Sequence, residues 1–330
     1  MRQSVGACLR AMLSLAINRR QAGSYRHKFP LYGRCVLHAA AAFSCPRKRP
    51  KAPCNLVSGH TSSNVLADFP ARSRLAPYPG TGRHSSQVLW SSVMTDTLIK
   101  VDLNQAATDN EQVHNRWHPD IPMACWVNPG DDFILETYDW TGGAIKNNDD
   151  ASDVRDVDLS TVHYLSGPVG VKGAQPGDLL IVELLDIGAK QDMLWGFNGF
   201  FSKNNGGGFL TDHFPSAQKS IWDFEGMFTK SRHIPGVRFA GLIHPGLIGC
   251  LPDHKMLADW NKREQALIDT NPTRVPPLAN PPFASTAHMG KMKGEARDLA
   301  AATGARTVPP REHGGNCDIK DLSRGSKIFL

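Results

Sequence analysis

A ten-residue segment, residues 311–320, gathers side chains that could do chemistry together. His313, Asn316, Cys317 and Asp318 bring an imidazole, an amide, a thiol and a carboxylate into one short stretch. Polar groups on a single turn can converge on one point, which a site for amide or metal chemistry requires. The same residue types also suit a solvated turn in which Asn and Asp bond their own backbone. The segment alone leaves both interpretations open.

Two adjacent glycines, Gly314 and Gly315, occupy the middle of this segment. Glycine adopts positive φ angles without a steric cost, and it lets a ligand or another chain come close to the backbone. If the segment forms a site, these glycines would contribute main-chain groups to it. We therefore treat both as candidate substrate-binding residues.

The elements that must position this segment are mostly of β type. From residue 113 onward, short apolar runs alternate with turn signals. Residues 179–187 form a nearly continuous apolar run, which predicts a buried strand. Other strands are predicted at residues 133–140, 162–165 and 237–243, and a long loop rich in Gly and Asn at residues 196–212.

Two helices are predicted within this β-rich chain. Residues 254–269 carry apolar side chains at helical spacing, and Asn271 followed by Pro272 ends the run. Residues 294–303 are rich in alanine, and a Pro-rich connector at residues 275–282 separates the two helices. Because strands and helices do not alternate as βαβ units, a doubly wound fold is excluded. The predicted fold class is mainly β with a small helical insertion.

Charge divides the chain into two domains of different character, residues 1–93 and 94–330. The first 93 residues hold 14 Lys or Arg and a single acid, Asp68, for a net +13. Since the whole chain carries +6, the remainder carries −7. An acidic body does not suit nucleic-acid binding, which needs a basic face. No apolar run reaches the roughly 18–20 residues of a membrane-spanning helix, so we expect neither nucleic acid nor membrane as partners.

The basic extension, residues 1–93, is expected to be disordered, because its charge is high and apolar periodicity is missing. Three origins stay open: mistaken translation upstream of Met94, an organelle transit peptide, and a functional basic arm. The body keeps three widely spaced cysteines, which favour a reducing compartment over a disulfide framework. We expect a cytoplasmic protein, or a mitochondrial one if the extension is a genuine transit peptide.

Four motifs of the body, in the same order, resemble the acetamidase/formamidase family of amide hydrolases, and the formamidase branch in particular. They lie at residues 136–143, 166–178, 244–252 and 313–318. The resemblance covers about residues 94–330. It implies a mainly β fold of barrel-like and sandwich halves, a homo-oligomer and a small amide substrate. The family continues past residue 330 into further strands, so we expect a chain that lacks the family's C-terminal part, with its activity dependent on what that part supplies.

Amide hydrolysis needs an activated water or nucleophile, a polarised carbonyl and a proton for the leaving ammonia. Asp318 is the first candidate for general base, and His313 for acid, base or oxyanion donor. Asn316 could orient the substrate through its amide. Glu136 and Asp139 are also candidates, but their odd spacing on a predicted strand places them on opposite faces. Of the two, Asp139 is nearer the following turn and is favoured for the site.

Three further possibilities stay open. Asp139, His313 and Asp318 could together bind a divalent metal such as zinc. Cys317 could act as a nucleophile if a neighbouring base lowered its pKa. His244, which precedes Pro245 and Gly246, could face a pocket and contact substrate.

The function predicted is hydrolysis of the C–N bond of small linear amides, with formamide converted to formate and ammonia. An acetamidase or another short-chain amidase is the alternative within the same class. A non-catalytic β-rich binding or assembly subunit is the alternative from another class, because the chain stops as a strand-like run at residues 326–330 begins.

Overall fold

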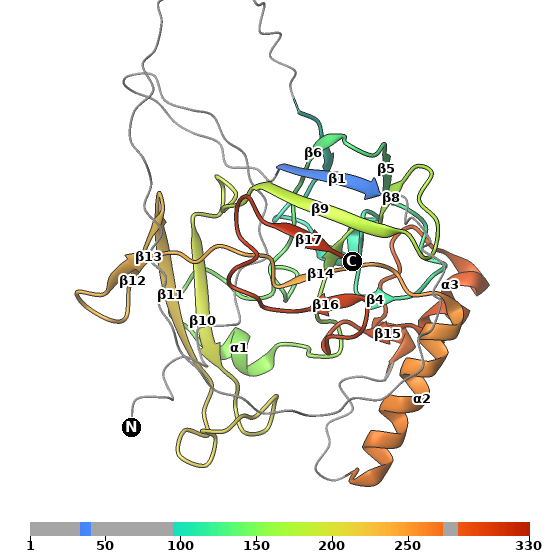
Figure 1. The fold of residues 1–330 in the computed structure, drawn as a ribbon. Helices are drawn as coiled ribbons and strands as arrows, with labels where there is room; N and C mark the ends of the chain where they lie inside the picture. The colour runs from blue at the N-terminus through green and yellow to red at the C-terminus, as the bar shows by residue number, and fades with distance from the viewer. Residues whose placement is uncertain (1–33, 41–94, 273–282) are drawn as a thin grey trace, which may run out of the picture. The chain divides into compact units, whose positions relative to one another are not determined.

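The computed structural model describes residues 34–40, 95–272 and 283–330 (Figure 1). Most of the basic extension and the Pro-rich connector at residues 275–282 therefore lie outside the described residues. The prediction of a mainly β chain with few helices is confirmed. Among the described residues, no helix combines the length and the apolar character that crossing a bilayer demands.

A five-stranded mixed sheet has the strand order β17-β9-β1-β6-β2. Its longest strand is β9, between β17 and β1, which the apolar run at residues 179–187 predicted. The bounds are β2 Thr97–Ile99, β6 Asp132–Leu135, β9 Leu179–Asp186 and β17 Lys327–Phe329, with β1 at Arg34–Ala40. β2 runs parallel to β6, and the other pairs are antiparallel. Its apolar core is formed by Val127, Phe133, Val182, Leu184 and Ile328.

Strand β1 belongs to the extension that the sequence predicted to be disordered. It pairs with both β6 and β9. This strand differs from the disorder expected for residues 1–93. Local composition could not predict it, because β1 forms by main-chain pairing with strands far along the chain.

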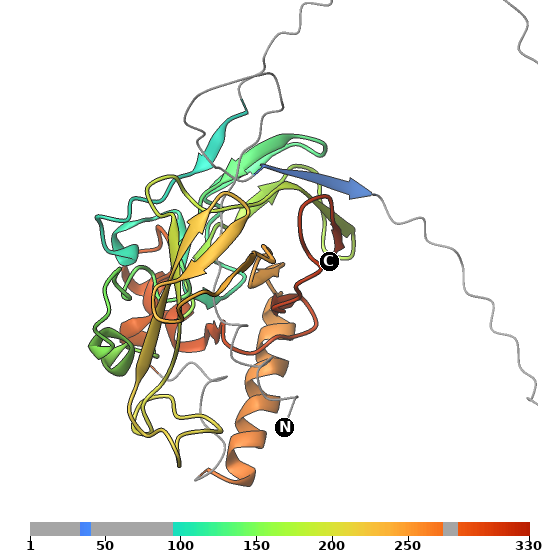
Figure 2. The same ribbon diagram turned by 90° about the vertical axis from the view of Figure 1, so that its left-hand side faces the viewer.

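A second, four-stranded sheet is an antiparallel meander of β10 to β13 (Figure 2). The bounds are β10 Trp195–Phe200, β11 Gln218–Glu225, β12 Phe228–Ser231 and β13 Arg238–Ala240. The predicted loop at residues 196–212 is therefore wrong over its first part. Glycines and Asn198 are accommodated in β10 because β11 pairs along it, and the Trp222 indole donates to the Asn198 side chain at 2.6 Å.

Both predicted helices are confirmed, as α2 His254–Thr270 and α3 Gly294–Thr303, and a short α1 covers Ser152–Asp156. Asp253 caps α2 by accepting from the Met256 amide at 2.6 Å. The helix buries residues at a spacing of three or four, which leaves its other face in solvent. These buried residues are Leu257, Trp260, Glu264 and Ile268.

Short strand pairs join the rest of the chain. They are β3 Val113–His114 with β7 Leu165–Ser166, β4 Arg116–Trp117 with β15 Ala305–Arg306, β5 Cys125–Val127 with β8 Val169–Val171, and β14 Leu247–Gly249 with β16 Gly314–Asn316. Two short 3-10 helices cover Ala107–Asp109 and Ala284–Thr286. The β14–β16 pair matters most for chemistry, because it places the segments at residues 244–252 and 313–318 side by side.

Two predicted strands differ in extent from those observed. The alternation of apolar and polar residues predicts a strand over residues 133–140, but β6 ends at Leu135. The chain leaves the sheet there because the Glu136 carboxylate accepts from the Val101 amide, 35 positions away. The strand predicted at residues 162–165 is reduced to β7. In both places long-range contacts override the local pattern.

Candidate active site

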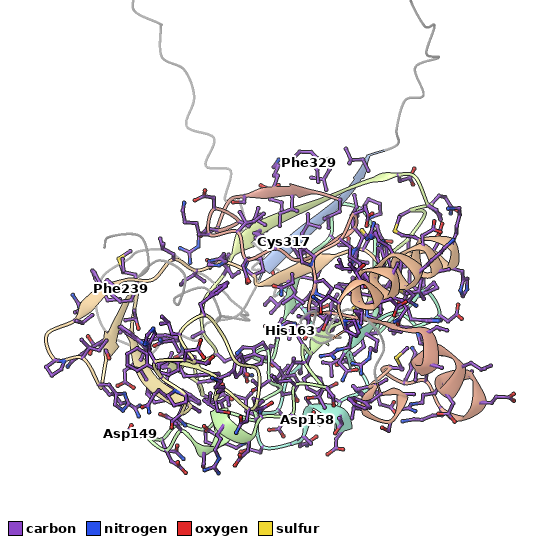
Figure 3. The ribbon with its side chains drawn as sticks, turned by 90° about the horizontal axis from the view of Figure 1, so that it is seen from below. Asp149, Asp158, His163, Phe239, Cys317 and Phe329 are labelled. Carbon is purple, nitrogen blue, oxygen red and sulfur yellow. The ribbon has the colours of Figure 1, made fainter. Side chains whose placement is uncertain are left out.

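A cavity of about 2370 Å³ is lined by residues from both sheets and from the β14–β16 pair. Five polar residues that the sequence singled out line it: His244, His313, Asn316, Cys317 and Asp318. Figure 3 marks the position of Cys317 among the side chains. A concave, largely preformed pocket with a few convergent polar groups is the usual form of a small-molecule site.

The β14–β16 pair sets the backbone of what we call the cavity segment, residues 313–318. Leu247 pairs with Asn316, and the Gly246 carbonyl accepts from the amides of both Cys317 and Asp318, at 3.0 and 3.1 Å. Asp318 has a φ of +46°, the only positive φ outside glycine among the described residues. Its Oδ1 lies 3.3 Å from the point a Cβ on Gly246 would occupy. Glycine at position 246 therefore leaves room for the Asp318 carboxylate.

His313 is held between two indoles. Its ring meets Trp117 edge-on with centroids 4.6 Å apart, and lies tilted against Trp260 at 4.5 Å. The residue is 8% exposed, and both ring nitrogens are buried without a hydrogen-bond partner. Desolvation, helped by the Arg311 cation, lowers the pKa of His313 to about 4. The imidazole is therefore neutral near pH 7, with one nitrogen able to accept a proton.

Helix α2 anchors the residues that precede His313. The Trp260 indole donates to the Glu312 carboxylate at 2.9 Å, and Arg263 pairs with the same carboxylate at 2.5 Å. Arg311 makes a two-bond ion pair with Glu264, at 2.7 and 2.8 Å. These contacts hold Arg311 and Glu312, the two residues before His313, against α2. The position of the His313 ring therefore depends on the packing of α2.

Two of the predicted substrate-binding residues each use one polar atom on the protein. His244 donates from Nδ1 to the Leu242 carbonyl at 2.7 Å, since a carbonyl can only accept, which leaves Nε2 with its lone pair. The Asn316 amide nitrogen donates to the Val308 carbonyl at 2.7 Å. The Asn316 carbonyl oxygen and His244 Nε2 are therefore the atoms of these side chains that remain for a ligand.

Cys317 lines the cavity as a thiol. Burial, followed by the charge of Asp318, raises its pKa. Nothing in its surroundings lowers that pKa as a nucleophilic cysteine requires. Cys250 is likewise a thiol whose pKa is raised by burial.

Asp139 and Glu136 do not line the cavity. Asp139 accepts from the amides of Thr141 and Gly143, each at 2.8 Å, and from the Thr141 hydroxyl at 2.5 Å. Burial raises the pKa of Asp139, and these bonds oppose the rise. Glu136 pairs with Lys190 at 2.9 Å and accepts from the Val101 amide at 2.8 Å. Both carboxylates are therefore used in holding the fold.

The glycines Gly314 and Gly315 also fall outside the cavity lining. They take φ angles of +99° and +91°. A Cβ on Gly314 would lie 2.5 Å from the Ile248 carbonyl oxygen, so the strand pair itself needs glycine here. Their role in the structure is to allow the close β14–β16 approach.

The structure does not bring Asp139, His313 and Asp318 together as a metal site. In the part of the chain that it describes, one group of three potential ligands has all its ligand atoms within 4.8 Å of one another, and it consists of His118, Asp120 and His254. No local sequence pattern predicts that group, because its members come from two segments more than a hundred residues apart.

Two further cavity residues are not among the candidates that the sequence singled out. His163 and Trp140 line the cavity, with ring centroids 5.9 Å apart. His163 Nδ1 and Trp140 Nε1 are both buried without a hydrogen-bond partner. Desolvation lowers the pKa of His163 to about 4. Figure 3 marks His163. Only the fold reveals these orphan atoms, because no local motif separates them from core residues.

Comparison with known proteins gives a consistent result. The family model described as the Acetamidase/Formamidase family matches residues 100–330. A formamidase from Methylophilus methylotrophus is 62% identical over 235 residues, which are 71% of this chain and 58% of that protein. An acetamidase from Mycolicibacterium smegmatis is 53% identical over 244 residues, covering 72% and 60% of the two chains.

A solved structure also matches. The gamma lactamase from Delftia acidovorans is 80% identical, with a TM-score of 0.69, over 72% of this chain and 58% of that one. The chain thus spans a little under two thirds of the length of each of these relatives.

Proposed function

This chain belongs to the acetamidase/formamidase family, and we propose that it hydrolyses the C–N bond of small linear amides, with formamide giving formate and ammonia. The observation that carries the proposal is the convergence of His244, His313, Asn316 and Asp318 on one cavity. The formamidase and acetamidase relatives support the reaction class.

The groups of the cavity segment supply the parts that the reaction needs. Asp318 takes a proton from water as the water oxygen attacks the amide carbon. The neutral His313 imidazole accepts that proton from Asp318, which returns to its carboxylate form, and passes it to the departing nitrogen, which leaves as ammonia. The Asn316 carbonyl oxygen receives the substrate N–H, and His244 Nε2 is a second acceptor at the cavity wall. One amide and one water are consumed, and one carboxylic acid and one ammonia are formed.

A single observation favours a second candidate substrate. The relative that is 80% identical is called a gamma lactamase. A γ-lactam is a cyclic amide, and its hydrolysis uses the same attack on an amide carbon but leaves the amine attached to the product. A cavity of about 2370 Å³ has room for a ring as well as for formamide.

We also propose a homo-oligomer in the cytoplasm. The described cysteines, Cys125, Cys250 and Cys317, are all free thiols, which suits a reducing compartment. Large apolar side chains are exposed in the turn between β11 and β12, on β13 and in the loop after β13, which suits a subunit contact; these are Met227, Phe239 and Leu242. Sedimentation at several concentrations would measure the mass.

The test is product formation by the 330-residue chain with a panel of substrates, with and without a chelator. Ammonia would be measured for formamide, acetamide and butyramide, and the free amino acid for a γ-lactam. The proposal expects formamide to be used best among the linear amides. Folded protein that turns over none of these substrates would instead support the non-catalytic binding subunit.

A further inference from the structure

A cluster of three potential metal ligands lies at the amino end of α2, outside the lining of the cavity. His118 and Asp120 come from the turn after β4, and His254 is the first residue of α2. Asp120 Oδ1 lies 3.0 Å from His254 Nε2, and Asp120 Oδ2 lies 3.9 Å from His118 Nδ1. One carboxylate thus stands between two imidazoles whose ring centroids are 5.8 Å apart.

The spacing of these atoms suits a small divalent cation. Zinc binds His nitrogen and carboxylate oxygen at about 2.0–2.2 Å in tetrahedral geometry, which places neighbouring ligand atoms about 3.4 Å apart. The separations of the two Asp120 oxygens from His254 Nε2 and His118 Nδ1, 3.0 and 3.9 Å, lie on either side of that value. Two imidazoles and one carboxylate are a donor set that zinc favours over calcium or magnesium.

Hydrogen bonds fix the tautomer of His118 in the form that a metal needs. The Thr303 hydroxyl donates to the Leu299 carbonyl at 3.3 Å, so toward His118 Nε2, at 3.2 Å, it acts as the acceptor. The Nε2 atom therefore carries the ring proton. Nδ1 is left with its lone pair, consistent with the 3.1 Å contact from the Asp120 amide. A ring nitrogen that donates to an outer group, with the lone pair of the other nitrogen directed at the ion, is typical of metal-bound histidine.

Burial differs among the three ligands in a way that allows an ion to enter. The His118 side chain is 5% exposed, whereas the Asp120 and His254 side chains are 54% and 69% exposed. His118 supplies a rigid inner ligand, and the other two can close on an ion that arrives from solvent. Water would complete the coordination on the open side.

We propose that His118 Nδ1, the Asp120 carboxylate and His254 Nε2 form a zinc site. Zinc would replace two existing contacts, the one between the Asp120 amide and His118 Nδ1 and the one between Asp120 Oδ1 and His254 Nε2. The bound ion joins the turn after β4 to the first turn of α2. Because α2 also anchors Arg311 and Glu312 through Glu264 and Trp260, the zinc stabilises the helix that positions the cavity segment.

The competing interpretation is a simple surface pair of His and Asp. The chain offers a matched example in His233 and Asp149, whose Nε2 and Oδ1 atoms are 3.3 Å apart. Among the described residues, this pair belongs to no group of three potential metal ligands. Asp149 is 71% exposed and is marked in Figure 3. Asp149→Asn therefore removes a comparable pair, and serves as the control.

The experiment is calorimetric titration of zinc chloride into the 330-residue chain, with thermal unfolding measured in parallel. We expect one zinc per chain and a higher Tm with zinc. Asp120→Asn and His254→Gln should each weaken zinc binding by more than about tenfold and abolish the rise in Tm. Thr303→Val, which removes the outer partner of His118, should weaken binding by about tenfold. Asp149→Asn should bind zinc as the unmodified chain does.

Zinc bound with the same affinity by Asp120→Asn and Asp149→Asn would overturn the proposal, as would a titration that shows no zinc binding. The readouts do not involve amide turnover, so they stand or fall separately from the proposed function.

Discussion

Two regions of this molecule share a carboxylate and two adjacent glycines, and their polar atoms have different surroundings. The Asp139 turn, residues 139–143, and the cavity segment, residues 313–318, each combine a carboxylate with two adjacent glycines. The glycines have positive φ in both: +69° and +85° at Gly142 and Gly143, and +99° and +91° at Gly314 and Gly315.

The difference lies in where the polar atoms find partners. In the Asp139 turn, the carboxylate accepts three bonds from Thr141 and Gly143. In the cavity segment, the His313 nitrogens have no partner, and His313 and Asp318 line a cavity. Leaving buried polar groups without partners costs free energy, so orphan groups beside a cavity point to a ligand. Similar residue types thus occur in a turn and in the proposed site, and the hydrogen-bond partners of their polar atoms are what differ.

The largest effect on stability that we expect comes from Gly142→Ala. A Cβ at this position would lie 2.6 Å from the Tyr164 ring and 2.9 Å from Ala107, on a backbone of positive φ. We predict a loss of about 3 kcal/mol in the free energy of unfolding. Gly143→Ala is the matched variant, because its φ is also positive but nothing lies within 4 Å, and it should lose only about 1 kcal/mol. Urea unfolding measures both, and equal losses would contradict the structural role of the Asp139 turn.

His313→Leu tests the opposite region. We predict that amide turnover falls by at least about 100-fold, because the proton acceptor is removed. The free energy of unfolding should stay within about 1 kcal/mol or rise, since a buried ring without hydrogen bonds is replaced by an apolar side chain of similar size. Ammonia release and urea unfolding measure the two effects. A variant that loses stability but keeps its turnover would place His313 in the core rather than the site.

The pH dependence of stability sharpens the comparison further. The pKa of His163 and of His313 is lowered to about 4 in the folded protein, by desolvation above all. In the unfolded chain the pKa of each histidine is near 6.5. Between pH 6.5 and 4 the unfolded chain therefore binds more protons than the folded protein does. The stabilising contribution is fully present above about pH 6.5 and is lost as the pH falls toward 4. Each histidine contributes up to about 1.4 kcal/mol per pH unit in that window.

His313→Leu should therefore flatten the slope of unfolding free energy against pH between pH 6 and 4 by about 1 kcal/mol per pH unit. Chemical unfolding at a series of pH values measures the slope. An unchanged slope would mean that the His313 ring takes up protons equally in the folded and the unfolded chain.

Much of the fold could be predicted from local patterns. The apolar run at residues 179–187 became β9, and the periodic runs after His254 and Gly294 became α2 and α3. Family membership predicted from the four motifs is confirmed by the match over residues 100–330. These features depend on spacing within one segment, which the sequence displays directly.

The remainder depended on contacts between distant segments. β6 ends where Glu136 meets Val101 and Lys190, and no local signal announces those partners. In the candidate site, the residue types of the cavity segment drew attention to His313 and Asp318, whose roles stay predictions. Asp139 was also a candidate, because its bonds to Thr141 and Gly143 appear only in the folded turn. His163 was not chosen, because only the fold shows that its Nδ1 atom is buried without a hydrogen-bond partner.

The most direct test compares Asp318→Asn with Asp139→Asn, two substitutions that replace a carboxylate by an amide of the same shape. Ammonia release from formamide and urea unfolding would be measured for both variants and for the unmodified chain. We predict that Asp318→Asn loses turnover by at least about 100-fold with its fold intact, whereas Asp139→Asn keeps its turnover and unfolds at lower urea. Turnover retained by Asp318→Asn and lost by a folded Asp139→Asn would contradict the assignment of chemistry to the cavity segment.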